Sequence, residues 1–143
     1  MSCLLKWIPG MQNRPNSPIQ NTVVFRRSPE YQETYLSKIK NNEQLKAKFR
    51  EFMEVKRNNP LQPFGSSDKQ FRGDGYFTAA VPGIKHAHIT HDLSIVYKVE
   101  GKNPTQVYLY GFYTHDDLGT GQPQNKNRQS SMAKTFAHRT FKE

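Results

Sequence analysis

The stretch His86–Val99, "HAHITHDLSIVYKV", decides the fold prediction. On both sides of His91-Asp92, β-branched and aromatic residues alternate with polar ones, which is typical of two antiparallel strands joined by a short turn. Side chains of a strand point alternately to its two faces. In the second strand one face therefore carries only large apolar side chains: Leu93, Ile95, Tyr97 and Val99.

A third strand follows at once. The segment Thr105–Tyr113, "TQVYLYGFY", has the same character, and Glu100–Pro104 before it is short enough for a second hairpin. The strands over 84–90, 93–99 and 105–113 therefore predict an antiparallel β-meander.

The residues before the meander indicate a strand and two helices. "TVVFRR", Thr22–Arg27, predicts a short strand, and Ser28-Pro29 is a helix N-cap followed by a proline suited to the first helical turn. Apolar residues then recur at helical spacing to Lys56, with Asn41 or Asn42 placed to cap a second helix. We expect a helical hairpin, followed by a long loop over 58–75.

These elements predict one α+β domain, since 143 residues suit a single core. We expect an extended arm over 1–21, the domain over 22–121 and a basic helical tail over 122–143. The apolar stripe of the tail, through Met132 and Phe136, is thin. The tail either packs weakly and binds a partner, or covers the sheet.

The composition limits the function. Lys and Arg number 21 against 12 Asp and Glu, and this formal net charge of +9 makes nucleic acid the first partner to consider, although a basic surface can also serve only solubility. Cys3 is the one cysteine, so no disulfide framework is expected. No apolar run approaches the roughly 18 to 20 residues of a membrane span. We expect a cytoplasmic protein without a membrane partner.

Histidines gather on the meander. Alternation places His86 and His88 on one face of the first strand, His91 and Asp92 lie at the next turn, and His115 ends the third strand. Such imidazoles suit metal binding or general acid and base chemistry. The alternative is that surface histidines have no role.

Nearby cations favour a phosphate over a metal. Arg72, Lys85 and Lys98 surround the histidines, and no glutamate is placed to complete a metal site. Two imidazoles with cations match what metal-independent RNA cleavage needs, because RNA supplies its own nucleophile in the 2′-hydroxyl. We therefore expect no cofactor.

The order of these elements, with "DLSIVYK" at Asp92–Lys98 and "THDDL" at Thr114–Leu118, resembles the RelE-like toxin superfamily, in particular its YafQ and YoeB-type mRNA interferases. The resemblance covers about residues 22–121. It implies an endoribonuclease toxin that cuts mRNA, often on the ribosome, leaves a 2′,3′-cyclic phosphate, and is inhibited by a cognate antitoxin protein. It also implies His88, Asp92 and His115 as catalytic residues.

The sequence departs from the family pattern where an arginine usually precedes the terminal Thr-His, since Gly111-Phe112-Tyr113 stands there. Phosphate and base contacts are therefore expected from other residues: Arg72, Lys85, His86, His91 and Tyr113. Two alternatives remain. One is a ParE-like toxin that inhibits gyrase without cleavage, against which His115 argues, and the other is a metal-binding protein built on the His-x-His pair.

Overall fold

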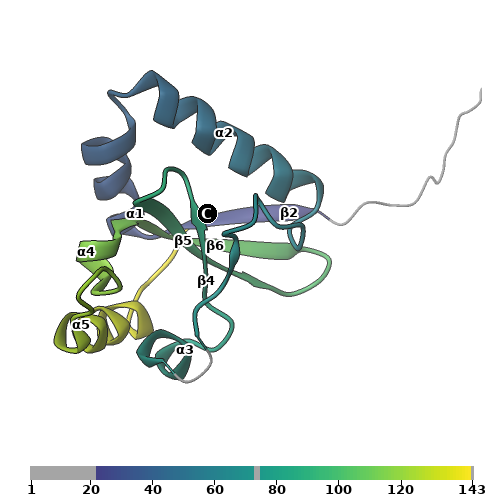
Figure 1. The fold of residues 1–143 in the computed structure, drawn as a ribbon. Coiled ribbons are helices and arrows are strands. Elements are labelled where there is room, and N and C mark those ends of the chain that lie inside the picture. Colours follow the sequence, from purple (N-terminus) through teal and green to yellow (C-terminus); the bar gives the residue numbers. More distant parts are fainter. Residues whose placement is uncertain (1–21, 73–74, 143) are drawn as a thin grey trace, which may run out of the picture.

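The computed structural model describes residues 22–72 and 75–142, and in this part of the chain five strands form one sheet with helices on both faces (Figure 1). The order is β2-β6-β5-β4-β3. The strands are β2 (Val23–Arg27), β3 (Lys69–Gln70), β4 (Lys85–His88), β5 (Leu93–Glu100) and β6 (Thr105–Thr114). The helices are α1 (Pro29–Thr34) with a π-helical continuation (Tyr35–Ile39), α2 (Glu43–Asn58), α3 (Tyr76–Ala80), α4 (His115–Leu118) and α5 (Lys126–Ala137). The predicted α+β class is confirmed.

The predicted meander is confirmed, because β4, β5 and β6 pair antiparallel in sequence order. β2 adds a parallel strand beside β6, in register from Val23 with Thr105 to Arg27 with Leu109. Two elements lie where we predicted only loop or made no prediction. β3, a strand of two residues, pairs with β4 at the edge of the sheet, and α3 follows it along the chain. The predicted arm over 1–21 lies outside the described residues.

Both helices of the hairpin begin where the predicted caps place them. The Ser28 hydroxyl accepts a hydrogen bond from Tyr31 N at 3.0 Å and contacts the carbonyl oxygen of Tyr110, also at 3.0 Å. This residue thus ties α1 to β6 as well as starting the helix. Asn42 caps α2, since its side-chain oxygen accepts from the backbone N–H groups of Gln44 and Leu45 at 3.1 Å.

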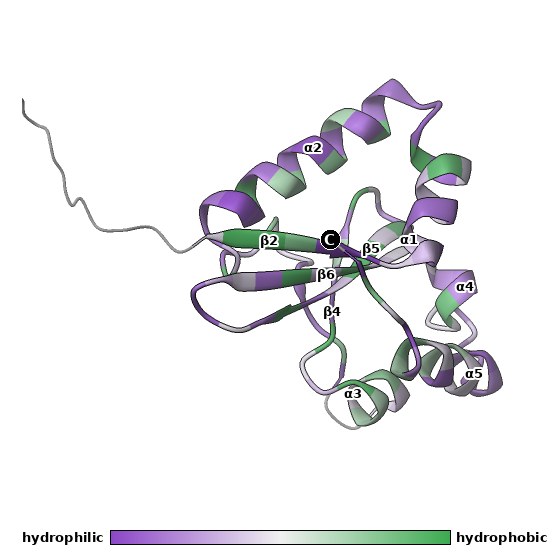
Figure 2. Cartoon of the chain, turned by 180° about the vertical axis from the view of Figure 1, so that it is seen from behind, coloured by the Kyte–Doolittle hydropathy of each residue, from purple (hydrophilic) through white to green (hydrophobic). Residues whose placement is uncertain are grey.

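Each face of the sheet has its own core. The hairpin covers one face, and the polar outer side and apolar inner side of α2 are visible in Figure 2. Buried residues of this core include Tyr31, Phe49, Phe52, Ile95, Tyr97 and Phe112. α3 and α5 cover the other face, where the buried residues include Phe77, Ile84, Val96, Tyr110, Tyr113 and Phe136.

The C-terminal helix packs on the sheet, which is the second of our two alternatives for it. Phe136 is buried against the rings of Phe77, Tyr110 and Tyr113, at centroid distances of 5.5 to 5.7 Å. After the helix, the backbones of Lys142 and Arg27 exchange two hydrogen bonds. Among the described helices, none is both long and apolar enough to cross a membrane.

Candidate active site

Three imidazoles and one carboxylate lie together at one end of the meander. The ring centroids of His86 and His88 are 5.9 Å apart, and those of His88 and His115 are 5.4 Å apart. His115 Nδ1 lies 3.1 Å from Asp92 Oδ1. We call His86, His88 and His115 the histidine cluster. The structure thus brings together the three residues that we predicted to be catalytic.

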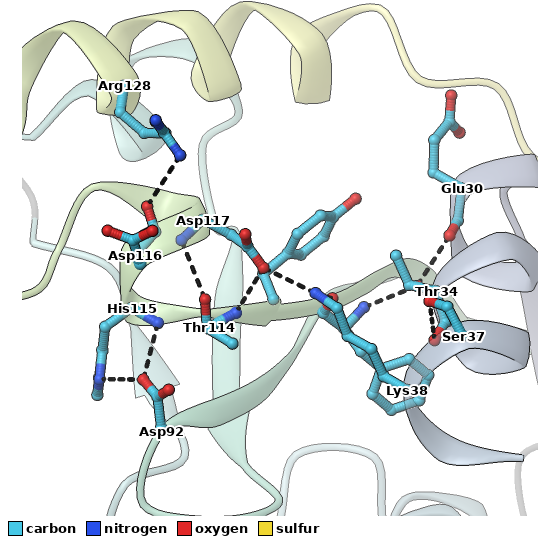
Figure 3. Close-up of polar contacts among 12 residues, drawn as sticks. Glu30, Thr34, Ser37, Lys38, Asp92, Thr114, His115, Asp116, Asp117 and Arg128 are labelled. Atoms are coloured by element: carbon cyan, nitrogen blue, oxygen red, sulfur yellow. Dashed lines mark hydrogen bonds and ion pairs between the residues drawn. The ribbon is translucent and has the colours of Figure 1, made fainter. Parts of the chain in front are cut away.

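Strand pairing explains why Asp92 meets His115. Leu93 pairs with Thr114 in the antiparallel register of β5 and β6, so the next residues outward, Asp92 and His115, are neighbours. The backbone N–H of His115 also donates to Asp92 Oδ1 at 3.1 Å (Figure 3). A single carboxylate oxygen therefore holds both the backbone and the ring of His115.

His115 is the first residue of α4 rather than the end of a strand, which corrects our prediction. Thr114 ends β6 and caps α4: its hydroxyl accepts from Asp117 N, and Asp117 accepts from Thr114 N, each at 3.1 Å. Lys38 fixes this turn from the helical hairpin, because its Nζ lies 2.7 Å from Asp117 Oδ2 and 3.0 Å from the Phe112 carbonyl (Figure 3). The position of His115 is thus fixed by Asp92 on one side and by the capped turn that Lys38 contacts on the other.

The electrostatics of the cluster favour neutral imidazoles on β4. Burial and, to a smaller extent, the neighbouring His88 lower the pKa of His86 to about 4. Burial and the nearby His115 also lower the pKa of His88. A neutral imidazole can accept a proton, so His88 suits the role of a general base at neutral pH.

A cation that we did not predict lies beside this cluster. Lys69 on β3 pairs with His86, and its charge lowers the pKa of both His86 and His88. Lys85 lies elsewhere: it shares its side of β4 with Ala87, which is buried in the core under α2. Our prediction that Lys85 stands beside the histidines is therefore wrong. No sequence pattern marks Lys69, which lies in a segment that we predicted to be a loop.

The other predicted contact residues are dispersed. Tyr113 is only 7% exposed and its hydroxyl contacts Arg139 Nη1 at 3.0 Å, so it belongs to the core under α5 and not to an open base-stacking surface as we expected. His91 is exposed in the turn before Asp92. Arg72 lines a pocket between α3 and α5. Across 22–72 and 75–142, no three His, Cys, Asp or Glu side chains are arranged to hold a metal ion.

No protein-family model and no curated protein matches the sequence. Solved structures with a similar fold include a YoeB/ParE toxin from Agrobacterium tumefaciens, which is 16% identical with a TM-score of 0.51 over 66% of this chain and 98% of that one. They also include the E. coli DinJ-YafQ toxin-antitoxin complex, at 22% identity and a TM-score of 0.50 over 70% of this chain and 98% of the matched one. The chain therefore has the RelE-like fold. Within that fold, its likeness is to the YoeB and YafQ toxins.

The low pKa of His86 predicts that the protein loses stability in mild acid. The unfolded chain has an ordinary histidine with a pKa near 6.5 and binds a proton between pH 6.5 and pH 4, whereas the folded protein does not. Stability must therefore fall as the pH falls through this range, by about 2 to 3 kcal/mol from this residue. Urea denaturation at pH 7, 5.5 and 4 measures the loss.

A His86→Gln variant is the matched control for that measurement, because it removes the titrating ring. We expect its stability to change less between pH 7 and pH 4 than that of the parent protein. Parallel curves for the two proteins would show that His86 is not the group responsible.

Proposed function

We propose that this protein is the toxin of a toxin-antitoxin system and acts as a metal-independent endoribonuclease on mRNA. The observation that carries the proposal is the Asp92–His115–His88 arrangement at the ends of β4 and β6, on the RelE-like fold. Two imidazoles whose ring centroids lie 5.4 Å apart can serve one phosphodiester as base and acid.

The chemistry follows from the surroundings of each ring. His88, whose pKa is lowered, takes the proton from the 2′-hydroxyl. The 2′-oxygen then attacks phosphorus, the bond from phosphorus to the 5′-oxygen breaks, and a 2′,3′-cyclic phosphate forms. His115 gives a proton to the leaving 5′-oxygen.

Asp92 fits the assignment of His115 as the acid. A carboxylate 3.1 Å from Nδ1 fixes the orientation of the ring, which leaves Nε2–H to face the leaving group. Lys69 is the cation on β3 that is closest in register to these rings and can stabilise the negative charge on the phosphate.

The partners follow from charge and from the similar proteins. A net charge of +9 suits mRNA and the ribosome as polyanionic partners, and it also suits an acidic inhibitory segment. In the E. coli structure, the YafQ toxin is bound by DinJ in a toxin-antitoxin complex. We propose that a cognate antitoxin likewise holds this protein inactive.

Cleavage of a defined mRNA, with and without ribosomes, tests the reaction. We expect cleavage to persist in excess chelator, to stop when the nucleotide at the cut carries 2′-deoxyribose, and to leave a 2′,3′-cyclic or 3′-phosphate end. The last two expectations follow because the nucleophile belongs to the RNA. Loss of cleavage in chelator, with recovery on adding zinc or manganese, would instead support the metal alternative.

A further inference from the structure

Two pockets with shared lining residues lie near the histidine cluster. The first, about 700 Å³, opens at Asp92 and His115 and is walled by the loop between α4 and α5. The second, about 340 Å³, lies between α3 and α5 and is lined in part by Phe71 and Tyr76. Gln124 and Lys126 line both pockets. We call the two together the C-terminal groove.

The walls of the groove are held by backbone contacts. Asn125 N donates to the Gly119 carbonyl at 2.9 Å, and Gln129 Nε2 donates to the same oxygen at 2.8 Å. Gly119 has a φ of +75°, and a Cβ there would lie 2.5 Å from the Asn125 carbonyl oxygen, so only glycine permits this approach. Thr120 N also donates to the His115 carbonyl at 2.9 Å. The loop is thus fixed relative to the candidate catalytic residue.

The two pockets differ in chemistry. Carboxylate and amide side chains dominate the first, which suits the hydrogen-bonding edge of a nucleobase better than a phosphate. Its volume lies within the roughly 300 to 1,000 Å³ usual for small-molecule sites. These groups are Asp92, Asp116, Gln122, Gln124, Asn125 and Asn127.

Aromatic rings mark the second pocket. Tyr76 lines this pocket and is 42% exposed at the start of α3, so its ring is open to stacking by a base. Phe71 packs against Phe77 at a centroid distance of 4.6 Å and against His86 at 4.4 Å. Through Phe71, the wall of the second pocket therefore contacts His86 of the histidine cluster.

We propose that the C-terminal groove binds the single-stranded RNA that flanks the cut. One base lies in the first pocket against the side chains of Gln122 and Asn127. The adjoining phosphate contacts Lys126, the cation shared by both pockets, and the next base stacks on Tyr76. This inference rests on the proposed function, for which it supplies a substrate-binding path formed by α3, α5 and the loop before α5.

Binding of an uncleavable RNA tests the groove separately from the chemistry. The probe is a fluorescent single-stranded oligonucleotide with a 2′-O-methyl group at the cut, titrated at several salt concentrations. Tyr76→Ala should weaken binding about 5- to 100-fold, the usual range for loss of one stacked base. Lys126→Ala should weaken binding and reduce the slope of log K against log salt by about 0.7, the value for one phosphate of a single strand.

Two control variants test whether a loss of RNA binding is specific to the C-terminal groove. Lys134→Ala removes the same charge from an exposed position of α5 that lines neither pocket, and Leu61→Ala removes an exposed apolar side chain elsewhere. Both should bind the probe like the parent protein. All variants are compared at matched thermal stability.

The outcomes separate this inference from the proposed function. If Tyr76→Ala and Lys126→Ala bind like the controls while the parent protein cleaves RNA, the groove is not the binding path and the ribonuclease proposal stands. If the parent protein cleaves no RNA but the two variants bind more weakly than the controls, the groove stands and the ribonuclease proposal fails.

Discussion

Replacing His115 with alanine is expected to lower the rate of RNA cleavage by about 10² to 10⁴, the usual effect of losing a general acid or base. His115 is the member of the cluster whose ring is held by a carboxylate, with Nδ1 3.1 Å from Asp92 Oδ1. Its ring is partly exposed, so removing it leaves no large cavity and the fold should persist. Single-turnover cleavage of a defined RNA measures the loss.

Two further variants sharpen this result. Asp92→Asn keeps the shape of the carboxylate but removes its negative charge beside the His115 ring, so it should also slow cleavage. His138→Ala removes an exposed histidine at the end of α5 and should leave cleavage unchanged. Equal rates for His115→Ala and His138→Ala, at matched circular dichroism spectra, would remove His115 from the mechanism.

Local patterns were sufficient for much of the fold. Alternation in Leu93–Val99 and Thr105–Tyr113 predicted β5 and β6 because one face of each strand enters the core under α2 while the other face carries several polar residues. Ser28 predicted the start of α1, and Asn41 or Asn42 that of α2, because such side chains satisfy free N–H groups of a first helical turn; the structure places Ser28 and Asn42 there. β3 has only two residues, which is too short for any periodicity to be visible.

The candidate site was predictable where strand geometry determines it. His86 and His88 share a face because they are two residues apart, and the meander returns His115 to the same end of the sheet. The same alternation places Lys85 on the opposite face, so nearness along the chain was the wrong criterion for a phosphate contact. Lys69 could not be found in this way, since its position depends on the pairing of β3 with β4.

Asp68, the residue before Lys69, forms a buried ion pair with Lys56 that helps to fix the position of Lys69. Lys56 Nζ on α2 lies 2.7 Å from Asp68 Oδ2, and the two side chains are 1% and 2% exposed. Asp68 also accepts from Phe64 N at 2.7 Å and from the Tyr97 hydroxyl, so one carboxylate joins the loop, α2 and β5. Burial lowers the pKa of Lys56, while Asp68 raises it.

Replacing Asp68 with asparagine is expected to destabilise the protein by about 3 to 5 kcal/mol, because it leaves the Lys56 charge buried without its partner. This is a large part of the roughly 5 to 15 kcal/mol that stabilises an ordinary domain. Urea denaturation at pH 7 measures the loss. As a control, Glu54→Gln breaks the exposed pair with Arg57 and should cost less than about 1 kcal/mol.

Two measurements test whether the unpaired Lys56 charge causes the loss of stability in the Asp68→Asn protein. In the Asp68→Asn protein the folded-state pKa of Lys56 falls further, so the unfolded chain binds more protons and stability should rise with pH towards the ordinary lysine pKa near 10.4. Adding Lys56→Met should recover part of the loss, since it removes the charge and keeps much of the side-chain volume. If the double variant is no more stable than Asp68→Asn and neither responds to pH, the hydrogen bonds of Asp68 to Phe64 and Tyr97, rather than its charge, hold the loop that leads to Lys69.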